Sequence, residues 1–166
     1  TKGCLSCPEL AAAPFHKTIH WPWIDLNVPP GERIGKAGHS INNFCISVQS
    51  NWSGCTSCHV GYGWVDDSFD FQNPEGVDCL VCHDTTGTYK KAPPAAGMPD
   101  PKVDLKFVAE NVGHATRRSC GTCHFNGGGG EAVKHADLSR QLLHPERNCD
   151  IHMGGYDFQC TECHQT

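Results

Sequence analysis

Cysteine and histidine recur in this sequence at one fixed spacing. Four segments have the form C-x-x-C-H: CTSCH at 55–59, CLVCH at 79–83, CGTCH at 120–124 and CTECH at 160–164. C-x-x-C-H is the attachment sequence of a c-type haem, in which both thiols add to vinyl groups of the porphyrin and the histidine becomes an axial ligand of the iron. One turn of chain places both sulfur atoms at one edge of the porphyrin and the next side chain beneath the iron, so the spacing itself serves the chemistry.

We therefore predict four covalently attached c-type haems. Zinc is the competing interpretation, because the 20 residues between Cys58 and Cys79 (59–78) would suit a four-cysteine zinc site. Zinc gives no reason for a histidine after every cysteine pair. The predicted thioether residues are Cys55, Cys58, Cys79, Cys82, Cys120, Cys123, Cys160 and Cys163, and the predicted proximal iron ligands are His59, His83, His124 and His164.

Four cysteines remain outside these motifs. Cys4 and Cys7 repeat the spacing in CLSCPEL, but Pro8 stands where the histidine would be. This pair has three interpretations: a disulfide, two free thiols, or a fifth haem whose iron ligands come from elsewhere. A disulfide between the other two, Cys45 and Cys149, would close a loop of about 100 residues. Three pairings of four cysteines are open, and we count four haems.

Histidine on both faces of each iron is the expected coordination. Met98 and Met153 are the only methionines, so methionine ligation could serve at most two irons. Seven histidines remain after the proximal ligands are assigned: His16, His20, His39, His114, His135, His144 and His152.

The composition favours a scaffold built around cofactors. Only 38% of the 166 residues are apolar, and 18 glycines and 11 prolines interrupt regular structure. We expect a single multihaem cytochrome domain over residues 1–166, mostly irregular, with a few short α-helices around a chain of haems and little or no β-sheet.

Charge and hydropathy narrow the partners and the compartment. The net charge is −5 and the 13 Lys and Arg residues form no basic stripe, which argues against nucleic acid. No apolar run approaches the ~18 residues of a membrane span. Haem attachment in bacteria and archaea takes place outside the cytoplasmic membrane, so we expect a periplasmic or extracellular protein.

The first of three predicted short helices covers residues 8–20, with Pro8 at its first position. His16 and His20 would then lie four residues apart on one face of that helix.

The other two predicted helices lie in the second half of the chain. Residues 101–112 have start signals at Asp100 and Pro101 and a stop at Gly113, beside His114. The apolar stripe of this helix would consist of Leu105, Val108 and Val112. The third helix, at about 131–143, follows the NGGGG loop and carries His135.

Several segments resemble, in order, the N-terminal part of the octahaem tetrathionate reductase family of multihaem cytochromes c. The resemblance covers most of the chain, and it is most specific in the second and third haem motifs with their following residues. The segments are TIHW (18–21), INNFC (41–45), CTSCHVGYGW (55–64), DCLVCHDTTGTYKK (78–91), PDPKVDLK (99–106), CGTCHFNGGGG (120–130), VKHADL (133–138) and DIHM (150–153).

The resemblance implies ligands on the second face of the irons. His20, His135 and His152 stand at histidines of the family pattern and are the implied distal ligands. The fourth distal ligand comes from His114, which we rank first, from His16, His39 or His144, or from a neighbouring subunit. The family also has one haem with a lysine ligand, thought to be catalytic, for which Lys90 and Lys91 are the candidates here.

Two function classes remain open. The first is an electron carrier rather than an enzyme, because histidine on both faces saturates the iron and leaves no position for substrate. Its partners would be other redox proteins or copies of itself in a conductive extracellular filament. The second is a reductase of tetrathionate, nitrite or similar oxyanions at a lysine-ligated or open haem, with Arg117 and Arg118 stabilising charge. Family members carry eight haems, so the resemblance to half of that relay weakens the transfer of their activity.

Overall fold

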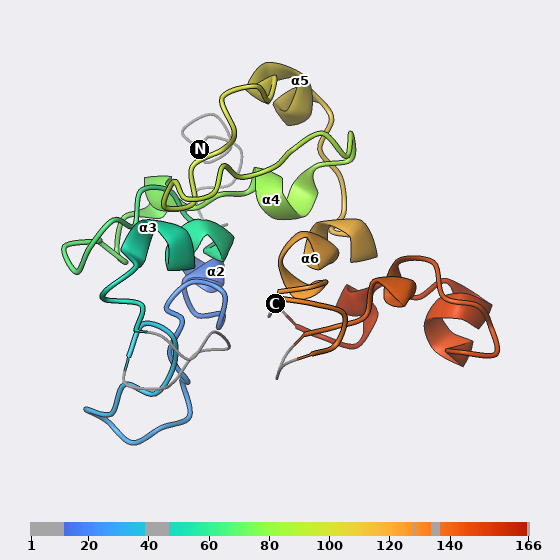
Figure 1. The fold of residues 1–166 in the computed structure, drawn as a ribbon, viewed down its shortest axis with the longest axis horizontal. Coiled ribbons are helices and arrows are strands. Elements are labelled where there is room, and N and C mark those ends of the chain that lie inside the picture. The colour runs from blue at the N-terminus through green and yellow to red at the C-terminus, as the bar shows by residue number, and fades with distance from the viewer. Residues whose placement is uncertain (1–11, 39–46, 128, 134–136, 166) are drawn as a thin grey trace. The chain divides into compact units, whose positions relative to one another are not determined.

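The structure of the chain is a computed structural model that describes residues 12–38, 47–127, 129–133 and 137–165 (Figure 1). Its helices are short and are separated by long irregular segments. They are α2 (Ala12–Phe15), α3 (Trp52–Cys55), α4 (Leu80–His83), α5 (Leu105–Glu110) and α6 (Arg117–His124), with the single turns η1 (Thr56–Cys58), η2 (Pro74–Gly76), η3 (Arg140–Leu143), η4 (Ile151–Gly155) and η5 (Cys160–Glu162).

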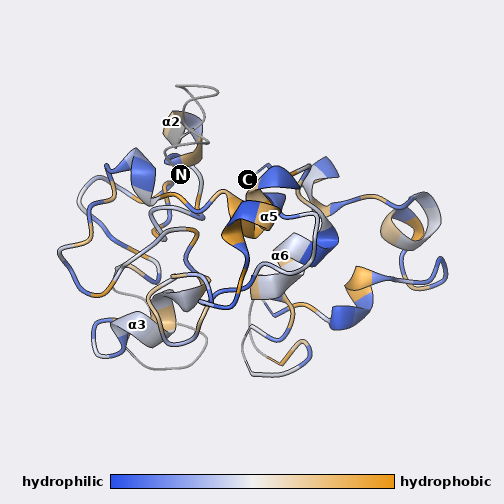
Figure 2. Cartoon of the chain, turned by 90° about the horizontal axis from the view of Figure 1, so that it is seen from above, coloured by the Kyte–Doolittle hydropathy of each residue, from blue (hydrophilic) through white to orange (hydrophobic). Residues whose placement is uncertain are grey.

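Strand pairing in the described parts of the chain is limited to isolated bridges. They join Gly61 to Val77, Asp84 to Val112, Lys91 to Pro99, and Phe125 to Leu138. Apolar and polar residues alternate over short stretches, and α5 carries both kinds (Figure 2). The predicted fold class, mostly irregular with a few short helices and little or no sheet, is confirmed. No helix among the described residues has the length and apolar character needed to cross a membrane.

The chain forms two compact units. Of the described residues, unit 1 contains 12–38, 47–79 and 90–103, and unit 2 contains 80–89, 104–127, 129–133 and 137–165. The CLVCH motif contributes Cys79 to unit 1 and its remaining residues to unit 2. The expectation of a single domain over the whole chain stays a prediction.

An aromatic cluster forms the core of unit 1. Trp21 and Trp64 are 1% and 2% exposed, and the Trp21 indole N–H donates to the carbonyl oxygen of Phe71 at 2.7 Å. The ring of Phe69 lies against both, with centroid distances of 5.8 Å to Trp21 and 5.5 Å to Trp64. Rings bury much area per residue, which suits a chain with few apolar side chains.

A buried ion pair ties two segments of unit 1 together. Lys91 Nζ lies 3.1 Å from Asp78 Oδ2, and the two side chains are 8% and 0% exposed. Lys91 also donates to the carbonyl oxygens of His59 and Gly61, and the Tyr62 hydroxyl donates to Asp78 Oδ1 at 2.8 Å. The buried charges are thus paired and hydrogen-bonded, which is the condition for their tolerance in a protein interior.

The predicted helix at 101–112 is shorter than expected. Asp100 does not start a helix, because its side chain accepts from the Lys102 N–H and closes a turn. Asp104 caps α5 instead and accepts from the Phe107 N–H. Of the predicted apolar stripe only Val108 is buried, whereas Leu105 and Val112 are 43% and 51% exposed.

The other two predicted helices also differ from the structure. A helix over 131–143 is wrong for its described residues, which turn at 131–132, bridge to Phe125 at Leu138, and form only the short turn η3. Glu131 instead accepts from the Ser139 hydroxyl, which folds this segment back on itself. At the N-terminal end the described helix α2 ends at Phe15, so His16 and His20 lie in turns and do not share a helix face.

Unit 2 has a small apolar core. Among its described residues the buried apolar side chains are Val81, Tyr89 and Val108, while Phe107, Leu138, Ile151 and Tyr156 are exposed. Such a unit needs another source of apolar contact, because burial of apolar area is the largest favourable contribution to folding.

The Lys91–Asp78 pair gives a stability prediction. Lys91→Met leaves the Asp78 carboxylate buried without its cation, so we expect it to lower the free energy of unfolding by about 3 to 5 kcal/mol. Lys90→Met is the matched control, because Lys90 pairs with Asp100 at 3.1 Å but is 62% exposed, and we expect it to cost less than about 1 kcal/mol. Denaturant titration of the haem-loaded proteins measures the free energy of unfolding of both variants. Equal losses of stability in the two variants would contradict a special role for the buried Lys91–Asp78 pair.

Candidate haem-binding sites

The second motif shows the clearest ligand geometry. His83 ends α4 and its side chain is exposed. Its Nδ1 lies 2.7 Å from the carbonyl oxygen of Gly113, and the Gly113 N–H donates to the His83 carbonyl oxygen at 2.9 Å. A histidine that binds a metal usually donates its other ring N–H to such an acceptor, which fixes the tautomer and the ring orientation. His83 therefore fits an axial iron ligand that binds through Nε2.

Residues 111–113 form a strap beside His83. The N–H and the hydroxyl of Thr85 both donate to the Asn111 carbonyl oxygen, at 3.2 and 2.8 Å. Thr85 also explains why residue 113 is glycine, since a Cβ there would lie 2.7 Å from Thr85 Cγ2. The strap contacts the imidazole at Nδ1, away from the Nε2 atom that would bind iron. His114 directly follows this strap, so we expect its side chain to serve a different iron from that of His83.

A carboxylate holds the loop after the second motif. Asp84 accepts from the N–H and the hydroxyl of Thr86 at 2.8 and 2.6 Å and from the Tyr89 N–H at 3.1 Å. These hydrogen bonds outweigh partial burial and leave the pKa of Asp84 below its ordinary value. Asp84, which directly follows His83, therefore fixes the conformation of the loop at 84–89.

The third motif lies on α6, whose start is well capped. The Thr116 side chain accepts from the Ser119 N–H, and the Ser119 hydroxyl accepts from the Thr116 N–H at 2.8 Å. A capping box of this kind satisfies two backbone donors at the helix start. It fixes the helix that carries Cys120, Cys123 and His124.

Thiols of three motifs gather in unit 2. Burial raises the pKa of Cys120 to about 12, with further contributions from Cys160, to which it is hydrogen-bonded, and from Cys82. Cys82, Cys120 and Cys160 belong to the second, third and fourth motifs. Three predicted haem attachment points are therefore neighbours, although they are far apart in the sequence.

The first motif is arranged differently. His59 is fully buried among aromatic rings, with centroids 4.9 Å from Trp64 and 5.3 Å from Trp23. Its Nε2–H donates to the Trp21 carbonyl oxygen at 2.7 Å, and its buried Nδ1 has no hydrogen-bond partner among the described residues. Burial lowers the pKa of His59 to about 4, so the ring is neutral, as a metal ligand must be. Ligation through Nε2 requires this ring to leave Trp21.

The described distal candidates lie in turns and loops. His20 is half-buried, and His114 is exposed. His152 lies on η4 with its side chain 67% exposed and its Nδ1 4.0 Å from Asp150 Oδ1. His16 is stacked on Trp21 at 4.6 Å, with its Nε2 buried and without a hydrogen-bond partner among the described residues. His144 is exposed directly after η3.

Several predicted residues lie outside the described parts of the chain, and their roles stay predictions. They are the distal candidates His39 and His135 and the extra cysteines Cys4, Cys7 and Cys45. Cys149 is described and is exposed, so its pairing with Cys45 also stays a prediction.

A pocket of about 290 Å³ lies beside α6, lined by Arg118, Gly121, Thr122, Phe125, Arg140 and Leu143. Arg118, Gly121 and Thr122 lie on α6 and Phe125 directly follows it, and the spacing of three and four residues from Arg118 to Gly121 and Thr122 places them on one helix face. Cys120 and Cys123 lie on the opposite face. The pocket is therefore not the seat of the haem that those two thiols would hold.

Two residues that organise these sites are not predicted from the sequence. Asp78 and Tyr62 fix Lys91 beside the first motif. Arg117 is predicted only as a group that stabilises substrate charge, and it is buried with protein partners. Lys91 is a candidate iron ligand by resemblance and Arg117 a candidate for charge stabilisation, but both are bound to carboxylates here.

Comparisons with known proteins place this geometry among multihaem cytochromes. No protein-family model matches the chain. The structure is similar to the crystal structure of octaheme cytochrome c from Shewanella oneidensis, with a TM-score of 0.86 and 46% sequence identity, and the match covers 100% of this chain and 37% of that one. A protein of Archaeoglobus fulgidus, described only as uncharacterized, is 26% identical over 220 aligned residues, which cover 99% of this chain and 72% of the relative.

The strap predicts a specific perturbation of one haem. Gly113→Ala places a methyl group against Thr85 and displaces the carbonyl that holds His83. Loss of this hydrogen bond makes the imidazole a weaker electron donor, so we expect the reduction potential of one haem to rise. Redox titration with paramagnetic resonance detection measures the change.

Thr85→Ser supplies the control for this variant. Serine keeps the hydroxyl that binds Asn111 but lacks the Cγ2 atom, so Thr85→Ser alone should resemble the parent protein. The double variant Thr85→Ser/Gly113→Ala should restore the parent potential. Unchanged potentials in the Gly113→Ala protein would contradict the role of the strap.

Proposed function

We propose that this chain is a multihaem c-type cytochrome that passes electrons between four closely packed covalent haems. The whole of this chain matches part of an octaheme cytochrome c. The observation that carries the proposal is the gathering of Cys82, Cys120 and Cys160 from three attachment motifs: α4, with Cys82, lies against α6, with Cys120, and the Arg117 N–H at the start of α6 donates to Gln159, directly before Cys160. Haems attached at neighbouring thiols have neighbouring edges, which suits electron transfer between them.

The match confirms the resemblance found in the sequence. It implies covalently bound c-type haem and supports electron transfer as the coarse function. The chain spans 37% of the length of the octaheme protein. The match therefore leaves the number of haems, the partners and the substrates of this chain as proposals.

The proposed coordination is histidine on both faces of every iron. His83 is oriented for it by Gly113. The lysines named as alternative ligands are in ion pairs, Lys91 with Asp78 and Lys90 with Asp100. A lysine binds iron only as the neutral amine, so these ion pairs favour histidine.

The proposed compartment is the periplasm or the cell exterior. The argument is chemical, since haem is attached outside the cytoplasmic membrane, where the four additional cysteines can also oxidise. The oxyanion reductase has weaker support, because Arg117 is buried and bound to Asp157 instead of facing a substrate.

Mass and magnetic resonance test the carrier. Each covalent haem adds ~616 Da through thioether bonds, so we expect an intact denatured mass with four haems. Saturated irons are low-spin, so the oxidised protein should show only low-spin signals and no change on addition of nitrite. A stoichiometric high-spin signal that responds to nitrite would support the reductase. A fifth haem would assign Cys4 and Cys7 to haem attachment.

We further propose that copies of the chain associate into an extracellular conductive filament. The support is that seven histidines remain for the second axial positions of four irons. A histidine of one copy can therefore bind an iron of the next copy. Repeated head-to-tail contacts form an open filament when the rotation from one copy to the next does not close a ring. Negative-stain microscopy at high protein concentration should show filaments, and a field of monomers would contradict the proposal.

A further inference from the structure

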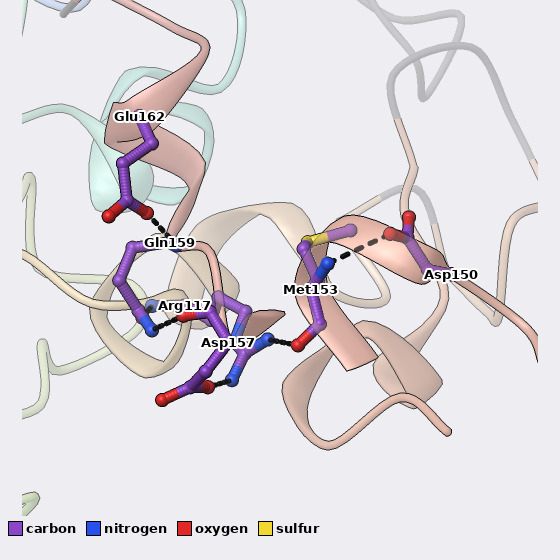
Figure 3. Close-up of polar contacts among 6 residues, drawn as sticks. All are labelled: Arg117, Asp150, Met153, Asp157, Gln159 and Glu162. Atoms are coloured by element: carbon purple, nitrogen blue, oxygen red, sulfur yellow. Dashed lines mark hydrogen bonds and ion pairs between the residues drawn. The ribbon is translucent and has the colours of Figure 1, made fainter. Parts of the chain in front are cut away.

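Arg117 is the first residue of α6, and Figure 3 shows its polar contacts within unit 2. It is only 8% exposed. An arginine cannot lose its charge in a protein, so its burial requires partners for the guanidinium group. The partners that hold it lie in residues 153–159, just before the fourth motif.

Three hydrogen bonds join Arg117 to that segment. Nη1 donates to the Met153 carbonyl oxygen at 2.8 Å, and Nη2 donates to Asp157 Oδ1 in an ion pair. The backbone N–H donates to Gln159 Oε1 at 3.0 Å. The guanidinium fork thus binds a carbonyl and a carboxylate at once, a geometry that lysine cannot reproduce.

The partners of Arg117 are themselves fixed. Met153 lies in η4, whose first N–H groups are capped by Asp150 at 2.8 and 2.9 Å. Gln159 precedes η5, and its backbone N–H donates to Glu162. Arg117 therefore connects three pieces that carry haem-binding residues: α6 with the third motif, η4 with His152, and η5 with Cys160.

The thiols support the same connection from the other side. Cys120 lies three residues after Arg117, and its thiol is a neighbour of Cys160, which follows Gln159 directly. The Arg117 contacts and the neighbouring thiols thus join the same pair of motifs. The Arg117 contacts do not involve the thiols, so they remain when both cysteines become thioethers.

We infer that Arg117 is a positioning residue that fixes the haem of the third motif relative to the haem of the fourth, and thereby sets electron transfer between them. The inference rests on the proposed haem loading. It replaces the expectation that this arginine neutralises substrate charge. Arg118 is the natural comparison, because it is adjacent in sequence but exposed on the pocket face of α6.

The test measures coupling between haems in holoprotein variants. Closely spaced haems give a split Soret signal in circular dichroism, and we expect R117Q to retain four haems and lose intensity in that splitting. R117K should recover it only partly, because one amine cannot replace the fork. R118Q should resemble the parent protein.

Two further variants separate positioning from stability. D104A removes the cap of α5, which carries no haem motif, and lowers stability without touching the Arg117 contacts, so its Soret splitting should equal that of the parent. D157N keeps the Arg117 contacts to Met153 and Gln159 and replaces R117Q as the test variant if R117Q does not fold. We expect D157N to lose less intensity in the Soret splitting than R117Q. An unchanged splitting in a four-haem R117Q, or in D157N where R117Q does not fold, would overturn the inference. A parent protein without haem at the third and fourth motifs would instead overturn the proposed function.

Discussion

Two thiols and a histidine within five residues impose a local geometry that the rest of the chain must accommodate. The attachment segment has to turn tightly, and the described motifs do so within α4, α6 and the single turns η1 and η5. Such short helices are not stable by themselves, because helix nucleation is costly and their length gives few hydrogen bonds in return. The loops between them need other contacts to hold them, and buried polar side chains supply many of these.

In both units a buried cation holds the segments around the haem motifs together. In unit 1 Lys91 bridges Asp78, which precedes Cys79, and the carbonyl oxygen of His59. In unit 2 Arg117 bridges Met153 and Asp157 next to the fourth motif. Each buried cation links two segments that contain or precede different haem motifs. Such charges add little net stability compared with apolar packing, but they fix one arrangement and penalise its alternatives.

Local chemistry is predictable from the sequence, and the long-range contacts are not. The haem motifs, the resemblance and the scarcity of regular structure all follow from residues close together in the chain. The helix predicted at 101–112 is too long because Asp100 is interpreted as its start signal, and only the structure shows that Asp100 closes a turn and that Asp104 caps the helix. The helix predicted at 131–143 fails because Glu131 bonds to Ser139 and folds the segment back. Arg117 next to a motif looks like a solvated charge, since nothing in the sequence brings residues 153–159 to it.

The contrast between His59 and His83 follows from the cores of the two units. Unit 1 has enough aromatic area to enclose a neutral imidazole, and there His59 turns its Nε2 to the Trp21 carbonyl oxygen. Its buried Nδ1 lone pair is left without a donor among the described residues, which costs about 1 to 3 kcal/mol. Unit 2 has few buried apolar side chains, and there His83 stays exposed with Nδ1 held by Gly113. An exposed ring with one nitrogen fixed is ready for iron, whereas a ring already packed in a core must exchange its contacts for the metal. Haem binding should therefore add most to the packing of unit 2, where exposed apolar side chains such as Phe107 and Ile151 have no core of their own.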